Sequence, residues 1–529
     1  MNGIISDVIS TKKKTPIDIQ IFDYKQCFDS LWLEECLNDM FNAGLNDDKF
    51  QLLYNINSDV KMAVKTPVGK SERGVLKNVI TQGDVFGPIL CSKQVDTFGQ
   101  ECLVEQKYTY LYKGEVEIPP LGMVDDLLCI SECGYQTAMM NSYINYKTNS
   151  KKLQFGATKC KKIHVGKFCE EFKCQKVSVD NWVEVPIEDK IKDVFNGEVE
   201  MEETESERYL GDIISNNGRN MNNFKARVNK GIGIVNNIFT YLEAIPFGKH
   251  YFEVGVMLRN SLLVSSVLCN SEAWYNVTEA EYNFIETVDL MFMRRILNAP
   301  KTTPKEMLYL ELGCLQFRHI IKKRRLSFLH YLLNEEPGSM INRFLWTQME
   351  KRNPKDWTTT ILRDLEELNI KLTLEEIKNM KITTFSNILK KAIDEKALKD
   401  LNKTKAKHTK VLRLKHTSVQ MKKYLKPNPM KITKEEMQFI FKLRSRMTEA
   451  KMNYQGLYDD FECGACGEEQ EDQEHIYQCK VLVKMNLNQE EIPQYEKNLN
   501  GKVIDHLQIA KIFMQNMANK ETLLKMQNS

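Results

Sequence analysis

The sequence predicts an α+β protein: a sheet with packed helices, then a long helical region, then a small zinc knuckle near the carboxyl end. Short apolar runs of strand character, such as Ile17–Phe22, alternate with helical patterns in the first part of the chain. From Asn222 to Leu333 the apolar residues follow helical spacing. Cys463 to Cys479 carry the spacing C-x2-C-x8-H-x3-C, which is typical of a tetrahedral zinc site.

The stretch Leu121–Ile130 places two adjacent aspartates, Asp125 and Asp126, between apolar residues. A short apolar run of this kind indicates a buried strand, and charges are rarely buried without a partner or a metal. We interpret it as a β-hairpin turn that holds two carboxylates at a strand-to-strand corner. The pairs at 47–48 and 459–460 lie in polar, turn-like contexts. A tight turn with aspartates directed to water remains the alternative at 125–126.

Length and composition allow several domains of ordinary size and a substantial core. The net charge of +3 is unevenly placed, because Lys403–Lys426 holds nine Lys or Arg and no acid, whereas Glu198–Glu207 is acidic. The amino terminus lacks the apolar core of a signal peptide. No window approaches the ~18 apolar residues of a membrane span; Val254–Leu268 is interrupted by Arg259. We expect an intracellular protein, nuclear or cytoplasmic, in which eleven of the fourteen cysteines are reduced core thiols.

The first strand, Ile17–Phe22, ends at Asp23, where the chain turns toward a helix predicted over Leu31–Gly44. Taken alone, Asp23 and Asp29 fit helix N-caps or turn residues as well as they fit catalysis. Residues 49–77 predict a helix followed by short strands.

The next segments alternate in the same way. Thr81–Leu90 opens a helix that runs to about Val104, and Gly83 removes side-chain bulk at a plausible backbone-approach site. A strand-like segment (107–117) leads into the aspartate pair. A helix (135–146), the stretch Leu153–Cys160 and a strand (162–165) follow.

The order of these segments resembles the palm of the reverse transcriptases of non-LTR (LINE-type) retrotransposons. The five motifs of that family are similar, in order, to IFDYKQCFDSLW, TQGDVFGPIL, MVDD, QFGATKC and YLGDII, which ends at Ile214. The resemblance implies an antiparallel sheet with packed helices and an RNA-directed DNA polymerase, a nucleotidyltransferase of a transposable element. It also implies an RNA template, a DNA primer and deoxynucleoside triphosphates as partners.

The resemblance also assigns roles to the polar residues. Asp23 and Asp125 would bridge two Mg²⁺ ions, with Asp126 as a supporting carboxylate, because two-metal nucleotidyl transfer needs hard oxygen ligands. Lys159 falls at the position proposed to protonate the pyrophosphate, although an exposed turn lysine is a close alternative. Residues expected to line the nucleotide are Tyr24, Phe28, Gln82 and Gly83, with Phe28 excluding a ribose 2′-hydroxyl.

Three residues depart from the family pattern: Met123 replaces an aromatic residue, Cys27 an alanine and Gly87 a serine. Only twenty-two residues precede Asp23. We therefore expect an amino-terminally truncated polymerase with at most a remnant of fingers. No nuclease cluster accompanies the zinc motif, so target cleavage is not expected of this chain, and a separate endonuclease is a candidate partner.

The expected domain organisation has six parts. It comprises a palm (1–170), a connector with a primer-grip-like segment (171–218), a helical thumb-like region (219–345), a helical basic linker (346–430), a helix with a CCHC zinc knuckle (431–485) and a carboxyl-terminal tail (486–529).

Three basic segments are candidates for phosphate contact: Arg294–Arg295, Lys322–Arg325 and the block Lys403–Lys426. A solvated helix face is the alternative for the first two, and a disordered polybasic linker for the third. Cys463, Cys466, His475 and Cys479 are the predicted structural zinc ligands. The competing function is a catalytically inactive or repurposed nucleic-acid-binding protein, RNA being the expected polymer, that retains the palm as a scaffold.

Overall fold

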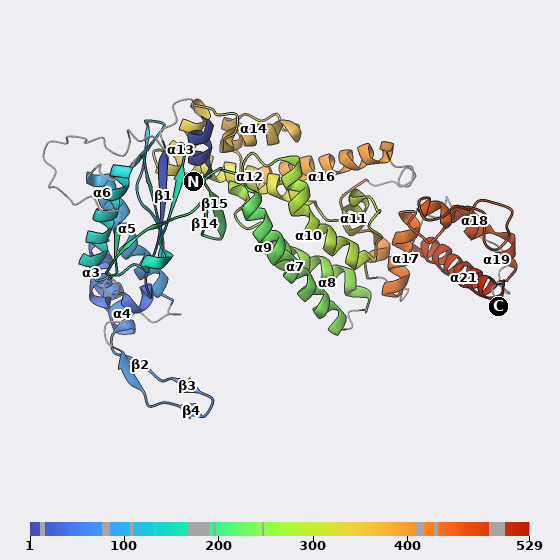
Figure 1. The fold of residues 1–529 in the computed structure, drawn as a ribbon, viewed down its shortest axis with the longest axis horizontal. Coiled ribbons are helices and arrows are strands. Elements are labelled where there is room, and N and C mark those ends of the chain that lie inside the picture. Colours follow the sequence, from blue (N-terminus) through green and yellow to red (C-terminus); the bar gives the residue numbers. More distant parts are fainter. Residues whose placement is uncertain are drawn as a thin grey trace. The chain divides into compact units, whose positions relative to one another are not determined.

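The computed structural model describes residues 1–10, 16–76, 85–105, 109–132, 134–166, 190–193, 197–245, 248–407, 417–427, 432–485 and 503–527. The fold is mixed α+β with a helical majority and a small, mainly antiparallel sheet (Figure 1). The chain divides into two compact units. Unit 1 contains residues 1–223, 273–276 and 331–362, and unit 2 contains residues 224–272, 277–330 and 363–529.

Unit 1 is built around a five-stranded sheet in the order β13-β10-β1-β9-β8. Its strands are β1 (Ile17–Asp23), β8 (Leu121–Met123), β9 (Asp126–Ser131), β10 (Lys161–Val165) and β13 (Glu202–Glu203). Strand β1 lies at the centre and pairs antiparallel with both β9 and β10, whereas β10 and β13 are parallel. The predicted antiparallel sheet is therefore present.

Alternation along β1 gives the sheet two apolar faces, because successive side chains of a strand point to opposite sides. Ile17, Ile19 and Ile21 pack on one face with the helix α1 (Asn2–Ser10) and the hairpin of β6 (Tyr110–Tyr112) and β7 (Val116–Ile118). Phe22 packs on the other face with three helices: α3 (Leu33–Asn42), α5 (Gly87–Glu105) and α6 (Gly134–Ser150). Both faces of the strand that carries Asp23 are thus buried.

The remaining elements of unit 1 are short. They are α2 (Cys27–Ser30), α4 (Asp47–Asn57), β2 (Val60–Met62), β3 (Lys65–Thr66), β4 (Gly69–Lys70), β5 (Gly74–Leu76), β11 (Lys190–Asp193), β12 (Gly197–Glu200), β14 (Ser206–Tyr209), β15 (Asp212–Ser215) and α13 (Met340–Glu350). The helices α7 (Met221–Ala244), α12 (Phe317–Asn334) and α14 (Trp357–Glu367) each contribute residues to both units.

Among the described residues, the elements wholly within unit 2 are helical. They are α8 (Tyr251–Leu258), a π-helical turn (Arg259–Val264), α9 (Ser265–Val267), α10 (Glu279–Leu297), α11 (Lys305–Leu312), α15 (Leu374–Asn379), α16 (Ile382–Lys407), α17 (Lys434–Arg444), α18 (Gln473–Gln478), α19 (Lys480–Lys484) and α21 (Val503–Gln527). A capping box starts α10, with reciprocal hydrogen bonds between Thr278 and Glu281. None of the helices in the described ranges combines the length and hydropathy needed to span a bilayer.

The helix expected at the start of the segment 431–485 ends at Arg444, because Arg446 adopts a left-handed backbone conformation (φ 53°) that no helix continues through. The segment expected as a carboxyl-terminal tail contains the helix α21. The described cysteines outside the zinc motif are free thiols, as expected, and all but Cys269 are buried.

Candidate functional site

The two predicted aspartate positions meet at one end of the central strands. In the β1–β9 register Asp23 lies opposite Asp126, although 103 positions separate them in the sequence. Asp125 occupies the two-residue turn between β8 and β9, because Met123 pairs with Asp126 across that hairpin. The sequence therefore folds so that three carboxylates share the corner of a single sheet.

The loop Gln154–Cys160 closes against Asp23 from a distant part of the sequence. The Gly156 amide donates to the Asp23 carbonyl (2.8 Å), and the Lys159 ammonium lies 3.1 Å from Asp23 Oδ2. A Cβ on residue 156 would lie 3.2 Å from that same carboxylate oxygen. Glycine thus lets this loop approach Asp23 closely and brings Lys159 to the predicted catalytic corner.

The carboxylates influence one another electrostatically. Burial, followed by the negative charges of Asp125 and Asp23, raises the pKa of Asp126. The Asp23 Oδ2 atom is buried and accepts no hydrogen bond, so the Lys159 ion pair is its only described partner. A divalent cation would reduce the repulsion between the three carboxylates and would give Asp23 Oδ2 a partner. Hard carboxylate oxygens are the ligands that Mg²⁺ prefers. These residues therefore fit a magnesium site.

Val124 adopts a left-handed backbone conformation (φ 58°) in the turn that carries Asp125. A β-branched residue there is strained, by about 1–3 kcal/mol. We expect Val124→Gly to lower the thermal stability of the protein only slightly, because relief of strain offsets both the entropy that glycine adds to the unfolded chain and the core contacts that the partly buried Val124 side chain makes. Val75→Gly, at a strand position without positive φ, should lower it more. Thermal unfolding of both variants checks this, and equal destabilisation by the two would contradict it.

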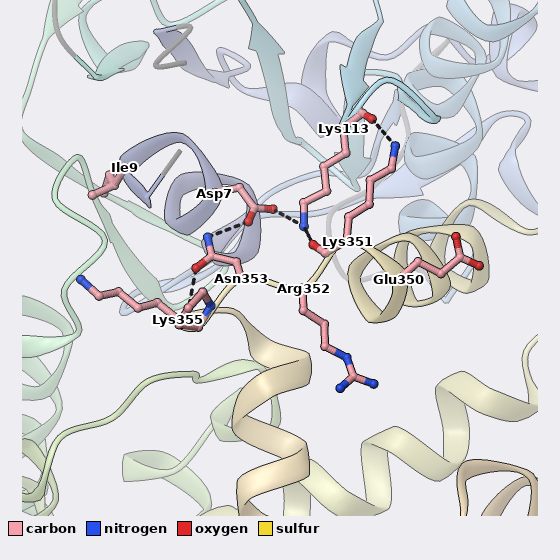
Figure 2. A pocket seen from close by; sticks show the side chains of 9 residues that line it. Asp7, Ile9, Lys113, Glu350, Lys351, Arg352, Asn353 and Lys355 are labelled. Atoms are coloured by element: carbon pink, nitrogen blue, oxygen red, sulfur yellow. Dashed lines mark hydrogen bonds and ion pairs between the residues drawn. The ribbon is translucent and has the colours of Figure 1, made fainter. Parts of the chain in front are cut away.

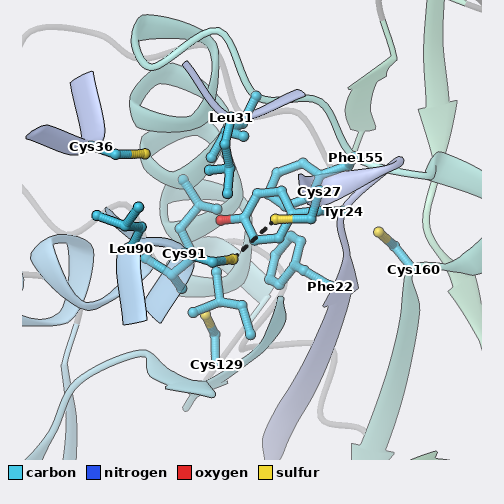
Figure 3. Close-up of a cluster of buried hydrophobic side chains, with 14 of the residues drawn as sticks. Phe22, Tyr24, Cys27, Leu31, Cys36, Leu90, Cys91, Cys129, Phe155 and Cys160 are labelled. Carbon is cyan, nitrogen blue, oxygen red and sulfur yellow. Dashed lines mark hydrogen bonds between the residues drawn. The ribbon is translucent and has the colours of Figure 1, made fainter. Parts of the chain in front are cut away.

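The residues expected beside the nucleotide have different environments. Tyr24 is only 3% exposed and stacks on Phe155 with ring centroids 4.9 Å apart, so its side chain belongs to the core (Figure 3). Phe28 is partly buried against the same core cluster. Gln82 and Gly83 lie outside the described residues. Cys27, which departs from the family pattern, is buried with its sulfur 3.3 Å from that of Cys91, as Figure 3 shows.

The fifth motif forms the β14–β15 hairpin, which turns through Leu210 and Gly211. The Tyr209 hydroxyl donates to the Leu121 carbonyl (3.3 Å), next to the carboxylate hairpin. Burial, followed by the charge of Asp126, raises the pKa of Tyr209. The structure thus brings the first, third, fourth and fifth motifs to one region of unit 1.

The short strands predicted within residues 49–77 are present, but the sequence did not indicate that they form an exposed basic β-ribbon. The strand pairs β2–β5 and β3–β4 extend from unit 1 as a two-stranded ribbon (Figure 1). It carries exposed basic side chains, and Val68 at its tip is 98% exposed. The basic residues are Lys61, Lys65, Lys70 and Arg73. Their spacing across short, separate strands produces no continuous charge run, and only the folded ribbon gathers them.

The basic cluster at 322–325 is largely committed to intramolecular partners, so its prediction as a phosphate-contacting surface is wrong. Arg325 is buried and pairs with Asp364 at 2.7 Å, and Lys322 pairs with Glu367. Arg324 donates to the Leu268 carbonyl. At the other cluster, Arg295 pairs with Glu243 at 3.2 Å.

The carboxyl end of the basic block is anchored. Tyr424 is buried and donates to Glu311 (2.6 Å), which also pairs with Arg444 (2.9 Å). A Cβ on residue 313 would lie 2.0 Å from the Met421 amide nitrogen, so Gly313 permits a very close backbone contact. A disordered linker is therefore excluded for residues 417–427, whereas residues 408–416 lie outside the described ranges.

A pocket of about 960 Å³ in unit 1 is lined by several basic residues (Figure 2). Its central cations are already paired, because Lys113 lies 3.2 Å from the buried Asp7 and Lys351 lies 2.5 Å from Glu115. Asn353 also donates to Asp7 (2.9 Å). Lys113 and Lys351 therefore have a structural role, since each has an intramolecular counter-charge.

The four predicted zinc ligands converge in unit 2. The ligand atoms of Cys463, Cys466, His475 and Cys479 all lie within 4.8 Å of one another. Cys466 Sγ lies 3.4 Å from His475 Nε2, and Cys463 Sγ lies 4.0 Å from Cys479 Sγ. Tetrahedral zinc requires edges of about 3.6 Å for sulfur–nitrogen and about 3.8 Å for sulfur–sulfur. A Cys₃His cluster that can hold zinc is therefore present.

The surroundings of these ligands also suit a metal. His475 Nδ1 lies 3.0 Å from Glu469 Oε2, which orients Nε2 toward the thiols as carboxylates do in zinc proteins. Burial raises the pKa of the Cys463 thiol to about 11. Burial also raises the pKa of the Cys466 thiol. Hydrogen bonds to this thiol from backbone amides, including that of Glu468, and from side chains outweigh burial, so the pKa of Cys466 is lowered.

Comparison with known proteins gives little guidance. No family model matches the sequence, and no curated protein matches it. Among solved structures, telomerase from Candida tropicalis in complex with a TWJ fragment of telomeric RNA matches with 12% identity and a TM-score of 0.31 over 71% of this chain and 50% of that chain. The corresponding Candida albicans complex matches with 12% identity and a TM-score of 0.27 over 66% and 52%. The chain thus spans about half the length of these telomerase chains, and TM-scores this low do not establish a shared fold.

Proposed function

We propose that this chain is an RNA-directed DNA polymerase of the non-LTR retrotransposon type. The observation that carries the proposal is the meeting of Asp23, Asp125 and Asp126 at one corner of the sheet, where burial and then the two neighbouring carboxylates raise the pKa of Asp126. Two-metal nucleotidyl transfer requires such a concentration of carboxylates. Four of the five family-like motifs lie in this region and support the same reading.

In this proposal Asp23 and Asp125 hold magnesium and Asp126 supports them. When bound, magnesium supplies Lewis-acid stabilisation of the attacking primer oxygen and of the leaving pyrophosphate. The Lys159 ammonium pairs with Asp23 at 3.1 Å. Its side chain is 69% exposed, so it can leave Asp23 and donate a proton to the departing phosphate. By resemblance to the family, Phe28, Gln82 and Gly83 line the nucleotide.

Primer extension tests this proposal. The full chain is incubated with an RNA template, a DNA primer, deoxynucleoside triphosphates and Mg²⁺, and labelled product is measured with and without a chelator. Chelator-sensitive incorporation that depends on the RNA template supports a reverse transcriptase. Binding of the primer–template without any incorporation at any metal concentration contradicts it.

The exposed basic ribbon favours a second candidate function, nucleic-acid binding on an inactive palm. Phosphate neutralisation by Lys61, Lys65, Lys70 and Arg73 would make RNA affinity fall steeply with salt. Charge reversal on the ribbon should then reduce both the affinity and its salt dependence. This candidate replaces the first if RNA binds tightly, binding survives Asp125→Ala, and neither protein incorporates nucleotides.

A further inference from the structure

The helix α21, which begins 24 residues beyond the last zinc ligand, packs on the zinc-binding segment. It contacts α17, α18 and α19, of which α18 carries His475 (Figure 1). Phe513 is fully buried in α21, with its ring centroid 5.7 Å from that of Phe439 in α17. The last helix of the described chain is therefore part of the zinc module, although it contributes no metal ligand.

Asn516 of α21 binds the backbone just before the fourth ligand. Its buried side-chain amide donates to the carbonyls of Ile476 (2.9 Å) and Tyr477 (3.2 Å). These carbonyls belong to α18, which carries His475 and ends one residue before Cys479. Docking of α21 thus helps to fix the backbone that presents two of the four ligands.

Glu471 joins α21 to the loop that carries the other two ligands. This carboxylate is fully buried and pairs with the Lys520 ammonium at 2.5 Å, and Lys520 is itself only 8% exposed. Glu471 also accepts from the amides of Gly464 (3.2 Å) and Lys451 (3.2 Å). Gly464 lies between Cys463 and Cys466, and a Cβ there would contact the Lys520 side chain at 3.4 Å. The Cys463–Cys466 turn is therefore held directly against α21.

We infer that zinc binding and docking of α21 are thermodynamically coupled, with Lys520 and Glu471 as the positioning residues that carry the coupling. Glu471 needs Lys520, because a buried carboxylate without its counter-charge is strongly unfavourable. An undocked α21 removes that counter-charge and loosens the Gly464 turn. Because coupling is reciprocal, loss of zinc must weaken docking of α21 to the same extent. This inference rests on the zinc site and is independent of the polymerase activity.

Zinc competition with a chromophoric chelator, on the full chain, measures the coupling. Lys520→Met should weaken zinc binding about 10- to 100-fold, as loss of residues that orient metal ligands does. Lys511→Met is the matched control, since Lys511 is an exposed residue of the same helix, and it should leave the zinc affinity unchanged. An affinity of Lys520→Met equal to that of the unmodified protein overturns the inference.

Amide hydrogen exchange of the unmodified protein gives a second test that needs no variant. Chelation of zinc should accelerate exchange in α21, while α10, in the same unit, stays protected. Unchanged protection of α21 after zinc removal overturns the coupling even though the site binds metal. If the unmodified protein binds no zinc at all, both the zinc site and the coupling are wrong. If it binds zinc but α21 keeps its protection after chelation, only the coupling is wrong.

Discussion

Replacement of Asp125 by asparagine is expected to reduce Mg²⁺-dependent nucleotide incorporation by about three orders of magnitude. A bound metal stabilises transition-state charge by several kcal/mol, and about 4 kcal/mol corresponds to a thousandfold change in rate. Asparagine preserves the shape of the turn but removes the anionic ligand. Asp23→Asn should have an effect of similar size, because Asp23 is the other proposed bridging ligand, opposite Asp126 in the sheet.

The matched control for this prediction is Asp48→Asn. Asp48 belongs to another Asp-Asp pair, is exposed, and lies in the first turn of α4 rather than at the strand corner. Single-turnover primer extension should leave its rate within about twofold of that of the unmodified protein, since surface changes away from a site have small effects. Equal rates for Asp125→Asn and Asp48→Asn would remove the proposed metal site.

Stability measurements distinguish lost chemistry from misfolding. The folded pKa of Asp126 is raised, so the native state holds this proton more tightly than the unfolded chain does. The stability associated with the proton is fully present below the unfolded pKa and is lost as pH rises through the folded pKa. At neutral pH, Asp126→Asn therefore removes an unfavourable charge, and the metal-free variant should be at least as stable as the unmodified protein.

The residues around this site show what sequence patterns can and cannot predict. Apolar residues on both sides of Asp125–Asp126 were enough to predict the hairpin, because strand burial is a local property of the sequence. The left-handed conformation of Val124 could not be predicted, since a β-branched residue disfavours it and tertiary packing must impose it. The contact between Lys159 and Asp23 spans 136 positions and was not predicted; the family resemblance only placed Lys159 near the pyrophosphate.

Charged residues of unit 2 show the same limit. Lys322 and Arg325 form part of a basic run whose composition indicates phosphate contact, yet their partners Asp364 and Glu367 lie about forty positions further along the chain. A pattern shows that a charge is present but not whether folding will bring it a counter-charge. The packing of α21, within the segment expected as a tail, could not be predicted for a related reason, because it depends on contacts with α17, α18 and α19.

Replacement of Arg259 by methionine is expected to destabilise unit 2 by about 3–5 kcal/mol. Arg259 interrupts the most apolar window of the chain, yet its side chain is only 1% exposed. It donates to both carboxylate oxygens of Asp289, at 2.7 and 2.6 Å, and to the Leu315 carbonyl at 3.0 Å. Burial raises the pKa of Asp289 even beside Arg259. Methionine would leave this carboxylate buried and unpaired.

Thermal unfolding followed by calorimetry measures this loss, which should lower the transition of unit 2 by roughly 10 °C. Arg295→Met is the matched control, because the Arg295–Glu243 pair is exposed and such pairs contribute at most about 1 kcal/mol. Adding Asp289→Leu to Arg259→Met should recover most of the stability, since apolar side chains can replace a buried ion pair. If Arg259→Met lowers the unfolding temperature no more than Arg295→Met does, then Asp289 does not need its buried counter-charge and the expectation is wrong. If the double variant stays as unstable as the single one, the loss comes from packing of the π-helical turn that begins at Arg259 rather than from an unpaired charge.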